Sequence, residues 1–76
     1  MPQQTFTALV EYDAETGMYV GSIPQLPGAF TQGATLDELR TNLTEVIELV
    51  LEEMAANGEQ LEFGQVIGTQ QVTVDL

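Results

Sequence analysis

The sequence predicts an α+β domain in which one helix covers one face of a small, mainly antiparallel sheet, with the element order β-β-β-α-β. Short segments near both ends alternate apolar and polar residues, as half-buried strands do. Between them, apolar residues recur every three or four positions, as on an amphipathic helix. Because 76 residues without Cys have room for only one hydrophobic core, we expect a single domain over residues 1–76.

The first two strands are predicted to form a hairpin. Residues 5–12 alternate, so that one side of the strand carries Phe6, Ala8, Val10 and Tyr12. Residues 13–17 are turn formers ending in a Gly suited to positive φ, and residues 18–23 are again rich in β-forming side chains. Leu9 falls on the opposite side, and an apolar cluster there with Met18 or Val20 would need a second subunit or partner to cover it.

An ordered loop or bend is expected over residues 24–28, because Pro24 and Pro27 each remove a backbone donor from any central strand. Residues 29–32 leave room for a short third strand. Thr35 can then cap a helix, with Glu38 completing a capping box. The apolar stripe of this helix comprises Leu36, Leu39, Leu43, Val46, Ile47, Val50, Leu51 and Met54.

The helix is expected to end at Asn57-Gly58, which suits a left-handed C-terminal cap. After it, Gly64 and Gly68 interrupt the chain. Val72, Val74 and Leu76 then alternate with Thr73 and Asp75, which predicts a fourth strand that closes the sheet.

The charge is strongly one-sided, with twelve Asp and Glu against one basic residue, Arg40, and a formal net charge of −11. Direct binding to nucleic acid is disfavoured, because phosphate contacts need clustered Lys and Arg. A basic protein partner is favoured instead, although the acids could also serve only as a solvated surface. Arg40 is expected to pair with Asp37, Glu38 or another neighbouring acid.

Catalysis is not expected. Without His, Cys or Lys the chain excludes the familiar nucleophilic triads and Cys/His zinc sites, and it has no P-loop or dinucleotide motif. Carboxylate chemistry with Mg²⁺ would need Glu11, Asp13 and Asp75 to converge, but turn geometry and strand alternation account for the two residues in the first strand and turn. We therefore expect no enzyme, cofactor or metal, and rank a metal-dependent nuclease last.

No leader-like or membrane-spanning stretch is visible, so we expect a cytoplasmic protein. Because so small a core often gains stability by pairing, we also expect a homodimer or higher homo-oligomer.

Residues 23–39 closely resemble the signature of HicB-like antitoxins, and the resemblance extends over about residues 5–60. A P-x-L-P-G segment, a T-x-G-x-T segment and an acidic helix follow one another at the family's spacing. The matching residues are Pro24, Leu26, Pro27, Gly28, Thr31, Gly33, Thr35 and Glu38. Their residue types indicate loop, turn and cap geometry, so we carry them over as scaffold residues.

The resemblance implies a partial ribonuclease-H-like fold that has lost catalysis and binds a HicA-type toxin, a small basic domain that cleaves RNA. Longer family members add a C-terminal DNA-binding segment, and this chain leaves no room for one after Leu76, so we expect the short form. For toxin binding, helical geometry singles out Glu45, Glu48 and Glu52. The alternative is a self-associating structural or regulatory module without a toxin partner.

Overall fold

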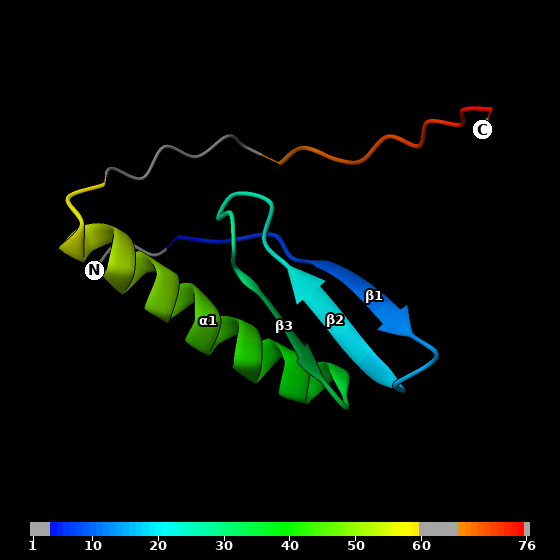
Figure 1. Ribbon diagram of the computed structural model, residues 1–76, viewed down its shortest axis with the longest axis horizontal. Coiled ribbons are helices and arrows are strands. Elements are labelled where there is room, and N and C mark those ends of the chain that lie inside the picture. The colour runs from blue at the N-terminus through cyan, green and yellow to red at the C-terminus, as the bar shows by residue number, and fades with distance from the viewer. Residues whose placement is uncertain (1–3, 60–65, 76) are drawn as a thin grey trace.

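A computed structural model describes residues 4–59 and 66–75 of the chain. Three strands, β1 (Leu9–Asp13), β2 (Met18–Ser22) and β3 (Phe30–Gly33), precede one long helix, α1 (Leu36–Ala56). The strands form one antiparallel sheet in the order β1-β2-β3, and the helix lies against one face of it (Figure 1). This arrangement confirms the predicted α+β class and the order of its first four elements.

The turn between β1 and β2 is made by its own side chains and one glycine. The N–H of Gly17 donates to the carbonyl of Asp13 over 2.8 Å, and Gly17 has a φ of 71°. The carboxylate of Asp13 accepts the N–H of Glu15 over 3.0 Å, as an Asx turn requires. These contacts bring Asp13 opposite Met18 and set the hairpin register.

The loop over residues 24–28 is ordered and contributes to the core. Ile23 and Ala29 close it, the N–H of Ile23 donating to the carbonyl of Ala29 over 2.9 Å. Within the loop, the N–H of Leu26 donates to the carbonyl of Ile23 over 3.0 Å. Leu26 is only 1% exposed, so the loop delivers one of the most deeply buried side chains of the protein. Gly28 has a φ of 88°, which allows the chain to turn at the end of the loop.

Both ends of α1 have the predicted caps. At the start, the N–H of Glu38 donates to the Thr35 hydroxyl over 3.0 Å, and the Glu38 carboxylate accepts the N–H of Ala34 over 2.9 Å. At the end, Gly58 has a φ of 71°, and the N–H of Glu59 reaches back to the carbonyl of Met54 over 2.9 Å. This is a Schellman closure.

The core lies between α1 and the two strands that the helix covers. Its buried residues are Ile23, Leu26, Ala29, Leu39 and Leu43. The backbone of the helix runs close to β3 and β2 and stays farther from β1. It approaches β3 closely at Gly33, where a Cβ would lie 2.5 Å from the backbone nitrogen of Leu39. The side-chain amide of Asn42 ties the two elements together by donating to the carbonyl of Gln32 over 2.8 Å.

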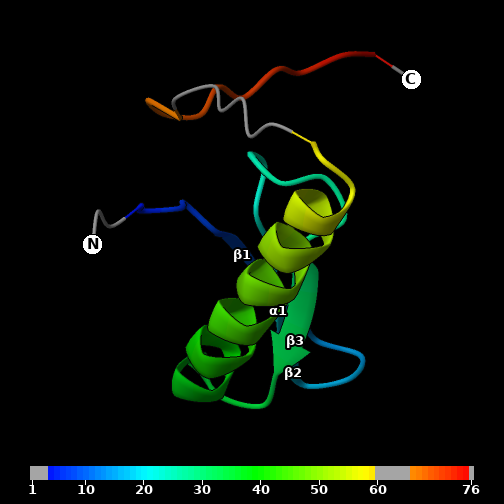
Figure 2. The same cartoon turned by 90° about the vertical axis from the view of Figure 1, so that its left-hand side faces the viewer.

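The expected fourth strand is not formed over residues 66–75. These residues have no regular secondary structure and run past the sheet without joining it (Figures 1 and 2). Val72 and Val74 alternate as predicted but are 80% and 66% exposed. Alternation separates an apolar from a polar side, but a strand also needs an edge to pair with, which the alternation does not supply. Gly64 and Leu76 lie outside the described residues.

Candidate protein-binding surfaces

The three glutamates predicted to bind a partner lie together on α1. Glu45, Glu48 and Glu52 are all exposed, and their spacing of three and four residues places them along one side of the helix. The buried Leu39 and Leu43 lie on the opposite side, against the sheet. We call these three glutamates the acidic strip; their carboxylates face outward along one side of the helix.

Leu49 interrupts the acidic strip with an apolar side chain that is 64% exposed. It follows Glu45 by four residues and precedes Glu52 by three, so it lies on the same side of the helix. The apolar periodicity did not identify Leu49 as a site residue, because it falls outside the stripe that faces the core. The sequence did contain a signal for Leu49: it is an apolar residue at a helix position where the amphipathic pattern predicts a polar one. Protein interfaces often bury such a residue inside a polar rim.

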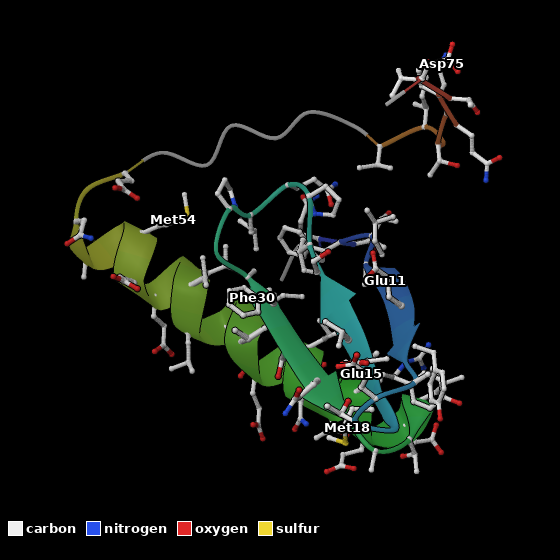
Figure 3. The ribbon with its side chains drawn as sticks, turned by 45° about the vertical axis from the view of Figure 1, so that its right-hand side comes forward. Glu11, Glu15, Met18, Phe30, Met54 and Asp75 are labelled. Carbon is white, nitrogen blue, oxygen red and sulfur yellow. The ribbon has the colours of Figure 1, made fainter. Side chains whose placement is uncertain are left out.

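A second candidate surface is the sheet face that points away from α1. Gly21 faces the helix, since a Cβ there would touch the side chains of Leu39 and Leu43. Its neighbours on β2 therefore point outward, together with the β1 and β3 residues that pair with them. This outer sheet face comprises Leu9, Glu11, Asp13, Met18, Val20, Ser22, Phe30 and Gln32. Figure 3 labels Glu11, Met18 and Phe30 on this sheet.

The outer sheet face is mixed in character. Leu9 and Phe30 are 44% and 66% exposed, and Leu9 shares the face with Met18 and Val20, as alternation predicted. At the hairpin end, Glu11 and residues 13–15 border a hollow of about 410 Å³. This face therefore joins apolar side chains to a strongly acidic end.

The carboxylates considered for metal binding are not brought together. Glu11 and Asp13 lie at the hairpin, whereas Asp75 lies on the separate segment after the helix (Figure 3). Among residues 4–59 and 66–75, no group of three acidic side chains is placed to hold a metal ion. The geometry of the described chain thus supplies no centre for metal-assisted cleavage.

Arg40 does not form the expected ion pair within the described part of the chain. The carboxylate of Glu38 is engaged by the backbone of Ala34 at the helix start. Arg40 instead lies exposed beside a groove between α1 and β1, which Asp37 also lines. The only basic side chain is therefore placed on a different side of the helix from the acidic strip.

The residues of the signature have mainly backbone and packing roles in the structure. Leu26 is buried, Gly28 has positive φ, and Gly33 admits the helix. Thr35 caps the helix as predicted, whereas the Glu38 carboxylate accepts the N–H of Ala34 instead of the Thr35 N–H of a capping box. In the described residues, no helix is long and apolar enough to cross a membrane.

Comparison with known proteins identifies the family of the chain. The model of the HicB-like antitoxin family of bacterial toxin-antitoxin systems matches residues 6–75. A UPF0150 protein of Thermotoga maritima is 41% identical over 96% of this chain and 93% of its own length. Another, from Synechocystis, is 46% identical over 97% of this chain and its full length. No solved structure shows a significant match. With a family model that spans nearly the whole described chain, the protein belongs to the HicB-like antitoxin family.

Proposed function

We propose that this protein neutralises a small basic, RNA-cleaving toxin of the HicA type by covering the toxin's basic surface with the acidic strip. The observation that carries the proposal is the row formed by Glu45, Glu48 and Glu52, exposed on the side of α1 that the sheet leaves free. Membership of an antitoxin family supports a toxin as the partner. The formal charge of −11 favours a partner of opposite sign.

In this mechanism the carboxylates take the positions that RNA phosphates would occupy on the toxin. They attract the basic surface over long range and then exclude the substrate, without any chemical step. Leu49 supplies apolar contact within the polar row, which slows dissociation once the surfaces meet. Since Arg40 is the only basic residue, we propose that the chain makes no direct contact with nucleic acid. The cytoplasm, where such a toxin meets its RNA, is the proposed location.

Reversing the charge of the acidic strip tests the proposal. In the variant Glu45→Lys/Glu48→Lys/Glu52→Lys, association with a purified HicA-type toxin should slow by at least about 10-fold at low salt, because the steering charges are reversed. Stopped-flow mixing would give the association rate, and RNA cleavage by the toxin would report whether neutralisation is lost. The difference from the unmodified protein should shrink as salt screens exposed charges.

The matched control carries the same change of charge at other exposed positions. Glu11→Lys/Glu15→Lys/Glu59→Lys alters the net charge by the same amount but leaves the acidic strip intact. It should slow association much less than the strip variant does. Equal slowing by both variants would assign the effect to net charge, and unchanged kinetics in the strip variant would place the contact elsewhere, for example on the outer sheet face.

Self-association without a toxin is the second candidate function. The observation that favours it is the apolar part of the outer sheet face, where Leu9 and Phe30 stay exposed. A protein that forms a stable oligomer and leaves the toxin fully active would support this function instead.

A further inference from the structure

Within residues 4–59 and 66–75, one edge of the sheet is left open. Among the described residues, β1 has β2 as its only neighbour, and α1 does not cover it. A groove of about 540 Å³ lies between this strand and the helix. Its apolar lining includes Phe6, Ala8 and Val10 on the strand side and Leu39, Leu43 and Ile47 on the helix side. A further strand along β1 would pair with its open edge and cover this groove.

Residues 66–75 have the pattern of such a strand but lack a place in the fold. Ile67, Val72 and Val74 are 93%, 80% and 66% exposed, far more than apolar side chains with a packing partner. In a strand conformation Val72 and Val74 would lie on one side of this segment, and Thr73 and Asp75 on the other. The segment therefore needs both a strand edge and an apolar surface, which are the two features left open at β1.

We propose that two copies of the chain exchange these segments, residues 71–75 of each copy adding a strand to the β1 edge of the other. Val72 and Val74 then enter the groove of the second copy, while Thr73 and Asp75 face outward. In the single chain the segment runs clear of the sheet and leaves its own β1 edge unpaired (Figures 1 and 2). A reciprocal exchange pairs the β1 edge of both copies and gives a closed dimer with two-fold symmetry.

Charge favours a second copy at this groove. Two chains of −11 repel each other over most of their surfaces. The groove is an exception, because among the described residues that line it only Asp37 and Arg40 are charged, and their formal charges cancel. The hairpin hollow, in contrast, is lined by three acids. The incoming segment is also weakly charged, since residues 66–75 contain one acid, Asp75. Strand pairing here is independent of the acidic strip and of toxin binding.

The mass of the full chain in solution tests the exchange. Light scattering after size-exclusion chromatography should give twice the 8.3 kDa of one chain. The variant Val72→Asp/Val74→Asp should give the mass of a single chain. We expect the dissociation constant of the dimer to rise on the order of 100-fold or more, because two carboxylates would have to enter an apolar groove. Circular dichroism should show α1 unchanged, because both valines are already exposed in the single chain.

The matched control is Gln71→Asp/Thr73→Asp, which adds the same charge to the opposite side of the same segment. It should remain dimeric. Hydrogen exchange gives a second measurement: amides of β1 and of residues 71–75 should be protected in the dimer and lose protection in the valine variant. A dimeric valine variant, or a control that also dissociates, would overturn the exchange. So would a monomeric unmodified protein, including one that protects residues 71–75 on its own β1.

Discussion

Gly33 sets the distance between β3 and α1, and the reason lies in the atoms around it. A Cβ at this position would lie 2.5 Å from the backbone nitrogen of Leu39 and 2.8 Å from its Cα. Both are helix backbone atoms, so the first turn of α1 would have to move. We expect Gly33→Ala to lower the free energy of unfolding by about 1–3 kcal/mol, as overpacking does. Urea denaturation followed by circular dichroism measures it.

Gly68 provides the control for this substitution. A Cβ at Gly68 would have no heavy atom within 4 Å, so Gly68→Ala adds the same methyl group without a steric clash. Its free energy of unfolding should stay close to that of the unmodified protein. If Gly33→Ala were equally harmless, α1 would not be held against β3 as closely as the structure indicates.

Side chains were predictable from the sequence where one local rule decided their position. The acidic strip follows from helical spacing alone, and the structure places its three glutamates on one exposed side. Leu49 and Leu26 show where such rules end. Exposure of Leu49 contradicts its residue type, and burial of Leu26 depends on how the whole loop folds back onto the helix. Both are consequences of tertiary packing, which periodicity does not describe.

The start of α1 is the element whose sequence signal and structure agree most closely. Its Thr35 hydroxyl accepts the N–H of Glu38 over 3.0 Å, satisfying a backbone donor that the helix itself cannot pair. Thr35→Ala should lower the free energy of unfolding by about 1 kcal/mol. The measurement is again urea denaturation, with the helix signal as the probe.

Thr44 is the matched control because its hydroxyl also makes a backbone hydrogen bond. It donates to the carbonyl of Arg40 over 3.1 Å within the helix, where it is not needed to cap an end. Since Ala is the better helix former, Thr44→Ala should be neutral or slightly stabilising. If Thr44→Ala lowered the free energy of unfolding as much as Thr35→Ala, a specific role for the cap would be contradicted.

Elements with local signals were predicted, and the one that depends on a distant partner was not. The hairpin turn, the Thr35 cap and the helix end are each decided within about five residues, and all three are present. A fourth strand over residues 66–75 requires an edge elsewhere in the fold or in another chain. The alternation around Val72 and Val74 predicts which side of the segment is buried in a strand. It does not predict which sheet edge the strand pairs with.

At the scale of the whole molecule, the excess of negative charge should make stability depend on salt. Twelve acids and one base at a formal charge of −11 repel one another more in the compact state than in the extended chain. Salt shortens the range of this repulsion, from about 30 Å at 0.01 M to about 8 Å at 0.15 M. The free energy of unfolding should therefore rise with sodium chloride over this range. Urea is the appropriate denaturant, because guanidinium would itself screen the charges.

A variant with fewer charges and nearly the same shape distinguishes charge repulsion from other effects of salt on stability. Glu45→Gln/Glu48→Gln/Glu52→Gln removes three negative charges from exposed positions whose side chains make no hydrogen bond in the described structure. This variant should be more stable than the unmodified protein at 0.01 M salt and should gain less from added salt. Equal salt responses in the two proteins would contradict self-repulsion and assign the effect to strengthened burial of apolar surface, which salt also promotes.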